Sequence, residues 1–154
     1  MRRHLLYLAL AMLVPCFAVA QSESSLKADC MQWFNGKKYA AIVKNATYYY
    51  RFGRRVTYTF TTAGAISSKD GKLVCEVNAK GESDDRTVWE ETYFFDGRRA
   101  LFIHPKRPTT DWLSLTPQGN CLLRDGRFRS NFGFGPPDEP DHIYKAGEAA
   151  FCPA

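Results

Sequence analysis

The sequence predicts a small all-β domain, an antiparallel and closed or nearly closed barrel, with a short N-terminal helix and a C-terminal tail tied by a disulfide. Short stretches of alternating apolar and polar residues recur through the chain, and glycine-containing turn signals separate them. No long helical pattern lies between them. Because exposed strand edges favour aggregation, about seven to nine such strands are expected to close on themselves or to form a sandwich.

The first 20 of the 154 residues are typical of a signal peptide rather than of a folded domain. Arg2 and Arg3 precede an apolar run, and Ala18-Val19-Ala20 supplies the small residues of a cleavage site. The run is too short for a transmembrane helix. We therefore expect residues 1–20 to be removed and residues 21–154 to form one β-barrel domain of a secreted protein, extracellular or, in a bacterium, periplasmic.

The first expected element of this domain is a helix over residues 26–34, which Ser25 would cap and Asn35-Gly36 would end. Apolar side chains at helical spacing indicate it, namely Leu26, Cys30, Trp33 and Phe34. The clearest strand follows at residues 55–61, where large apolar residues alternate with threonines. This strand should bury one face.

Further strands follow at short intervals, each beside a turn signal. We expect them at residues 72–79, 87–95, 99–103, 111–115, 120–123 and 127–132. Asp96-Gly97 predicts a hairpin, and Asp125-Gly126 predicts a turn between the last two strands. The Pro- and Gly-rich residues 133–141 predict an irregular segment, and residues 144–151 predict either a short helix or a last strand.

Four cysteines remain once residues 1–20 are set aside: Cys30, Cys75, Cys121 and Cys152. An even number in an exported chain indicates two disulfides, whose pairing the spacing alone does not define. Close cysteine or histidine spacing of the kind that binds zinc is lacking. We expect no metal and no cofactor.

The charge argues against two classes of partner. Loss of Arg2 and Arg3 lowers the net charge from +5 to +3, and the densest remaining basic groups lie beside turn signals. Nucleic-acid binding calls for a more concentrated basic patch. Without a transmembrane segment, no membrane partner is expected either.

The same residues offer no recognisable catalytic set, so we expect a protein that is not an enzyme. A secreted hydrolase would need His104 and His142 in one cleft, and their spacing gives no support for this. Glu90 and Glu91 are adjacent, so in a strand they point to opposite faces and cannot act as a carboxylate pair.

Aromatic residues make up 14% of the sequence, which is high for a small domain. They either fill the core of a barrel or line a ligand cavity, and composition does not separate the two. Strand alternation nominates the lining residues as Tyr58, Phe60, Trp89, Glu91, Tyr93, Phe102 and Trp112. An inward Glu91 would be costly unless paired, for instance by a cationic ligand; alternatively its face points to solvent.

The segment Phe34-Asn35-Gly36-Lys37-Lys38-Tyr39-Ala40-Ala41-Ile42 resembles the entrance of the lipocalin fold, where a helical turn leads through a glycine into the first barrel strand. Lys38 stands at the family's usual tryptophan position, and Trp33 is the candidate to replace it. The spread of the four cysteines and Tyr48-Tyr49-Tyr50-Arg51 are similar to salivary lipocalins of blood-feeding arthropods, particularly ticks.

The resemblance implies the disulfides Cys30 with Cys121 and Cys75 with Cys152. It does not extend to histamine binding, because Glu76 follows the second cysteine where that pattern has an aliphatic residue. It implies a monomeric, secreted salivary protein that sequesters a small amphipathic or aromatic ligand, such as a biogenic amine or a lipid mediator. Asn45 begins a glycosylation tripeptide, which matters in a eukaryote.

The alternative function is a small exported protein that binds another protein, such as a host protein, in the manner of a protease or lysozyme inhibitor. It would use loops such as residues 105–110 or 132–142 instead of a cavity. A filled barrel with an exposed aromatic and basic loop would favour it.

Overall fold

The structure is a computed structural model that describes residues 21–43, 54–129 and 143–154. The predicted signal peptide, the Asn45 tripeptide, the tyrosine run at 48–50, the irregular segment 133–141 and His142 lie outside the described residues. The chain enters through one helix, α1 (Glu23–Phe34). This helix begins earlier than predicted because Ser22, and not Ser25, is the cap: the Ser25 amide donates to the Ser22 hydroxyl over 3.2 Å.

Nine strands follow among the described residues, all paired antiparallel. They are β1 (Lys38–Ile42), β2 (Arg55–Thr61), β3 (Ile66–Lys69), β4 (Lys72–Ser83), β5 (Val88–Phe95), β6 (Ala100–Ile103), β7 (Trp112–Gln118), β8 (Cys121–Arg129) and β9 (Ile143–Pro153). Consecutive strands are neighbours, β9 returns to β1, and β2 pairs with β4, so eight strands close a barrel. The predicted fold class is confirmed.

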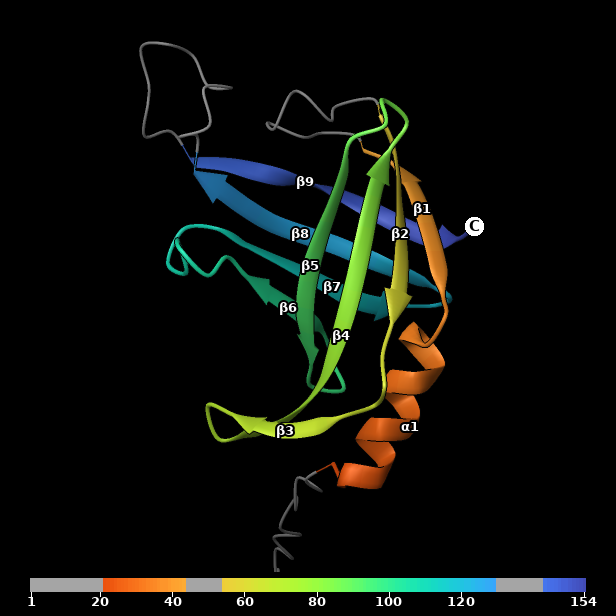
Figure 1. Ribbon diagram of the computed structural model, residues 1–154, viewed down its shortest axis with the longest axis vertical. Helices are drawn as coiled ribbons and strands as arrows, with labels where there is room; N and C mark the ends of the chain where they lie inside the picture. Colours follow the sequence, from red (N-terminus) through yellow and green to blue (C-terminus); the bar gives the residue numbers. More distant parts are fainter. Residues whose placement is uncertain (1–20, 44–53, 130–142) are drawn as a thin grey trace, which may run out of the picture.

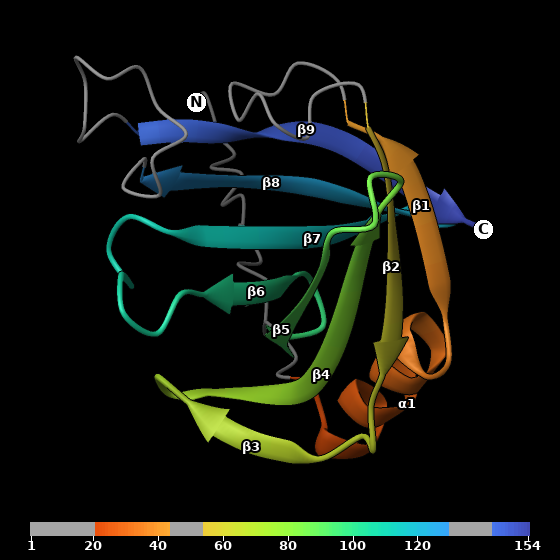
Figure 2. The ribbon, with the colours of Figure 1, turned by 45° about the horizontal axis from the view of Figure 1, so that its top comes forward.

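Strand β3 is not one of the eight strands that close the barrel; it extends the barrel wall next to β4. It forms a hairpin with the first residues of β4, and the turn at Asp70-Gly71 has positive φ angles of 51° and 75°. The sequence pattern predicts the strand from residue 72 onward but does not predict strand β3 before it. Figures 1 and 2 show α1 against one end of the barrel. The β3–β4 hairpin projects beyond the barrel at the same end. The helix therefore closes that end, which we call the helix end.

Packing explains the closure of the helix end. Phe34, fully buried at the last turn of α1, meets the rings of Phe60 and Phe95 edge to face, with centroids 5.2 Å away in both cases. Trp33, the predicted replacement for the family tryptophan, is only partly buried, and its carbonyl accepts a 2.7 Å hydrogen bond from the Tyr39 hydroxyl. Phe34 is thus the plug of the barrel.

The predicted turn at Asp125-Gly126 is wrong, because β8 runs through both residues with a register shift between Arg124 and Gly126. Gly126 faces inward, and a Cβ there would meet the Leu113 side chain and the Trp112 carbonyl. Here the glycine permits close packing between two strands and does not form a turn. The C-terminal segment is strand β9, the second of the two alternatives.

The four cysteines form two disulfides, but the pairing implied by the lipocalin resemblance is wrong. The bonds are Cys30–Cys75 and Cys121–Cys152. Cys30 lies on α1, which packs against β4, and Cys75 is on that strand. The other two cysteines occupy facing ends of the neighbouring strands β8 and β9, so the C-terminus is tied down as predicted. Each bridge therefore joins elements that already lie in contact.

Candidate functional site

The barrel interior brings together six of the seven predicted lining residues. Tyr58 and Phe60 come from β2, Trp89, Glu91 and Tyr93 from β5, and Phe102 from β6. The two β2 residues and Tyr93 are fully buried, and Trp89 and Phe102 are partly buried against the core. A closed barrel with such a buried aromatic cluster is compatible with ligand binding.

The aromatic rings are in contact with one another across strands. Tyr58 lies 5.7 Å from Phe60 and 5.9 Å from Trp89, measured between ring centroids, and Tyr93 lies 5.8 Å from Phe102. Phe60 continues the contacts toward the plug of the helix end. The described interior is thus apolar at the helix end, and the hydroxyl groups of Tyr58 and Tyr93 add polar atoms to it.

Glu91 faces inward, as its alternation with Trp89 and Tyr93 predicted. The Tyr93 hydroxyl donates a 2.6 Å hydrogen bond to Glu91 Oε2. Burial, first of all, and then the neighbouring Glu91 carboxylate raise the pKa of Tyr93 well above its ordinary value. Tyr93 is therefore a protonated donor at neutral pH, and its proton is directed at Glu91.

Sequence reasoning missed Arg124, a buried cation in the same interior. It lies on β8 opposite Leu115 and Ala149, is 4% exposed, and its Nη1 is 3.5 Å from the Tyr58 hydroxyl. Its guanidinium carbon lies 5.1 Å from the centre of the Phe151 ring. The sequence does contain a pattern that places Arg124 inside. If the alternation of inward and outward residues is extended through Asp125-Gly126, then Leu122, Arg124 and Gly126 share one face of the strand.

Tyr58, Glu91, Tyr93 and Arg124 form what we call the interior polar cluster. These four residues come from β2, β5 and β8, and two hydrogen bonds join them pairwise. Beside the cluster, the Trp89 indole lies over Gly81 of β4, where a Cβ would collide with the ring. Further along β4, the buried Ser83 hydroxyl has no hydrogen-bond partner among the described residues. The interior thus combines polar groups with aromatic surface.

The seventh predicted residue, Trp112, is on the outer face of β7, so its inward assignment is wrong. Its register partners are Ile103 and Arg127, which are both exposed. Leu113 and Leu115, the alternate residues of the strand, are buried instead, opposite Phe102 and Ala100. The pairing with β6 decides which face of β7 is inside.

His104 belongs to an ordered loop between β6 and β7 and not to the interior polar cluster. Its Nδ1 accepts a 3.2 Å hydrogen bond from the Lys106 amide, and Asp111, fully buried, pairs with Arg107 at 2.9 Å. Burial and, next, Arg107 lower the pKa of His104. Among the described residues no group of three or more His, Cys, Asp or Glu side chains is placed to hold a metal.

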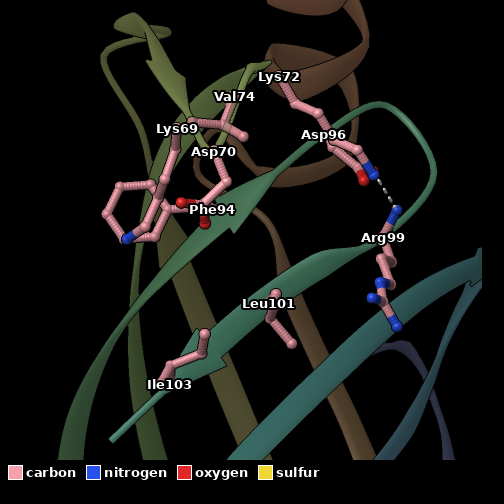
Figure 3. A pocket seen from close by; sticks show the side chains of 9 residues that line it. All are labelled: Lys69, Asp70, Lys72, Val74, Phe94, Asp96, Arg99, Leu101 and Ile103. Atoms are coloured by element: carbon pink, nitrogen blue, oxygen red, sulfur yellow. Dashed lines mark hydrogen bonds between the residues drawn. The ribbon is translucent and has the colours of Figure 1, made fainter. Parts of the chain in front are cut away.

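A separate pocket of about 200 Å³ lies on the outer face of the barrel wall, where the β3–β4 hairpin, β5 and β6 meet (Figure 3). Apolar side chains line part of it, namely Val74, Phe94, Leu101 and Ile103; charged ones line the rest, namely Lys69, Asp70, Lys72, Asp96 and Arg99. The Lys69 ammonium lies 3.7 Å from the centre of the Phe94 ring. None of the seven predicted lining residues belongs to this pocket.

No protein-family model matches the sequence, and neither the curated proteins nor the solved structures compared with it gave a match. The single helix of the described residues is not long and apolar enough to cross a membrane.

Proposed function

We propose that the protein is an exported, lipocalin-type barrel that binds one small amphipathic or aromatic ligand in its interior, without chemistry on that ligand. The observation that carries this proposal is the interior polar cluster set among aromatic rings. A barrel whose interior served packing alone would be expected to hold apolar side chains, because burying charged groups is costly. Ligand sites typically combine an apolar wall with a few convergent polar groups.

The two disulfides support export, because such bonds persist in oxidising compartments. Two small ligand classes match the charges of the interior polar cluster: a biogenic amine would match Glu91, and a lipid mediator with an anionic head group would match Arg124. In either case the ligand would lie against Trp89 and Phe102, which are the partly buried aromatic residues of the cluster region.

Tryptophan fluorescence provides the test, because the three tryptophans of the chain differ in position: Trp89 lies inside the barrel wall, Trp112 lies on its outer face, and Trp33 lies on α1. We expect amphipathic ligands, screened as fatty acids and aromatic amines, to quench the fluorescence of the purified protein with saturation at one ligand per chain. The variant Trp89→Phe should lose most of this response, and the matched control Trp112→Phe should keep it. Equal responses of both variants, or no binding in native mass spectrometry, would contradict the proposal.

The alternative function is that of a protein-binding inhibitor, and the outer surface of the barrel would bind the partner. The outer pocket presents Phe94 and Ile103 beside three cations, and the neighbouring loop is held by the Arg107–Asp111 ion pair. A partner with an acidic and apolar segment would fit this face. Charge reversal at Lys72 and Arg99 should abolish capture of such a partner while leaving ligand quenching intact.

A further inference from the structure

Arg124 differs from the other buried charges that the structure describes. Asp111, equally deep, has Arg107 at ion-pair distance. Arg124 forms no ion pair with any carboxylate of the described residues, and its Nε has no hydrogen-bond partner. Its polar contact is the long 3.5 Å approach of Nη1 to the Tyr58 hydroxyl. Among the described residues, the buried guanidinium of Arg124 therefore has partners for few of its N–H donors.

The burial of Arg124 without an opposite charge among the described residues is energetically unfavourable. The arginine side chain carries a positive charge, and its guanidinium offers only hydrogen-bond donors. Removing an ion from water is costly unless an opposite charge and hydrogen bonds compensate. The contact with the Phe151 ring recovers only part of that cost. An anion bound against Arg124 would supply the missing compensation.

Glu91 does not supply it. Its carboxylate is inside the same barrel but forms no ion pair with Arg124, and its Oε2 accepts the short hydrogen bond from Tyr93. Because the raised pKa keeps Tyr93 protonated, that bond persists at neutral pH. One oxygen of the Glu91 carboxylate is thus bonded to a neighbour on its own strand and not to Arg124.

We propose that Arg124, assisted by the Tyr58 hydroxyl, binds the anionic head group of the ligand, a carboxylate or sulfonate carried on an apolar body. This inference rests on the proposed interior ligand site and selects the anionic class over the amine suggested by Glu91 alone. The planar guanidinium is suited to paired hydrogen bonds with two oxygens of one acid group. The apolar body would pack against Trp89 and the neighbouring rings.

Two fluorescent probes that share a phenyl-naphthylamine ring system test this inference. 8-Anilinonaphthalene-1-sulfonate carries a sulfonate, and N-phenyl-1-naphthylamine carries no charge. The wild-type protein should bind the sulfonate about tenfold to a hundredfold more tightly than the neutral probe, as expected for a charge-assisted hydrogen bond in a buried site. Arg124→Met should remove this preference while retaining the neutral probe, and Arg124→Lys should restore part of it.

The matched control is Lys80→Met, which removes one positive charge from the outer face of β4 and should leave the preference unchanged. Near-ultraviolet circular dichroism and a stoichiometry of one probe per chain establish that the variants are folded. If the wild type and Arg124→Met bind both probes equally, Arg124 does not recognise the head group, although the interior site stands. If neither probe binds the wild type, the proposed function itself fails.

Discussion

Removal of the helix-end disulfide is expected to destabilise the barrel by about 4 kcal/mol. The Cys30–Cys75 bridge closes a loop with a sequence separation of 45 residues, and the Cys121–Cys152 bridge closes one of 31. In the chain-entropy relation both separations give about 4 kcal/mol of stabilisation at 25 °C, because the dependence on loop length is logarithmic. The double variant Cys30→Ala/Cys75→Ala removes this constraint and leaves the second bridge in place.

Urea unfolding followed by tryptophan fluorescence measures the effect. With a slope of about 2 kcal/mol per molar urea, typical of small domains, the unfolding midpoint should fall by about 2 M. The variant should contain no free thiol, because Cys121 and Cys152 are bonded to each other. The mixed variant Cys30→Ala/Cys121→Ala, in contrast, should expose two thiols.

Peptide mapping without reduction gives the refuting result. A Cys30–Cys121 or Cys75–Cys152 peptide from the wild-type protein would show that the crossed pairing, implied by the lipocalin resemblance, exists in solution. Two free thiols in Cys30→Ala/Cys75→Ala would lead to the same conclusion. A midpoint unchanged by the double variant would refute the loop-closure estimate but not the pairing.

Three further predictions concern packing and pH. Phe34→Ala should lower the free energy of unfolding by about 3–5 kcal/mol in urea titrations, because it leaves a cavity where the ring closes the barrel, and Phe34→Leu should lower it clearly less. Gly81→Ala should cost about 1–3 kcal/mol and shift the tryptophan emission, because the new methyl group displaces the Trp89 indole. The lowered pKa of His104 means that the unfolded chain binds its proton more tightly; stability should therefore fall as pH is lowered from about 6.5, and less so in His104→Asn.

Each of these outcomes can fail in a way that identifies the error. A Phe34→Ala variant as stable as wild type would mean that the helix does not close the barrel. An unchanged emission spectrum in Gly81→Ala would place the indole elsewhere. Identical pH profiles for His104→Asn and wild type would show that the imidazole titrates as it does in the unfolded chain.

The sequence predicted which residues face the barrel interior wherever large apolar residues lie on only one face of a strand. In β2 the apolar residues alternate with threonine, and β5 carries aromatic residues at regular positions, so Tyr58 and Tyr93 could be placed inside. In β7 both faces carry apolar residues, and the larger side chain, Trp112, was chosen wrongly over Leu113. Only pairing with the neighbouring strand, which a single strand's pattern does not encode, decides such a case.

Two other errors have the same physical origin. Asp125-Gly126 is a strong local turn signal, yet tertiary packing of Leu113 over the glycine keeps β8 extended. Taking these residues as a turn hid the alternation that places Arg124 inside. The disulfide pairing depends on which remote elements meet in space, and cysteine spacing carries no information on that.

Arg107, which is partly buried, and Arg124, which is buried, offer a last prediction that separates a charge needed for the fold from one kept for binding. Arg107→Met removes the ion-pair partner of the fully buried Asp111 and should destabilise the protein by about 3–5 kcal/mol, because a buried carboxylate loses the opposite charge beside it. Arg124→Met removes a cation that has no opposite charge beside it among the described residues, so the ligand-free variant should be as stable as wild type or more stable by about 1–4 kcal/mol.

Thermal or urea unfolding of both variants, without added ligand and then with saturating 8-anilinonaphthalene-1-sulfonate, completes the comparison. The probe should stabilise the wild type and the Arg107→Met variant by the same increment and the Arg124→Met variant by much less, since a ligand stabilises only the form that binds it. A large loss of stability in ligand-free Arg124→Met would mean that the charge is a structural requirement of the barrel. Retained stability together with a lost response to the probe is the pattern expected of a residue kept for its ligand at a cost to the empty fold.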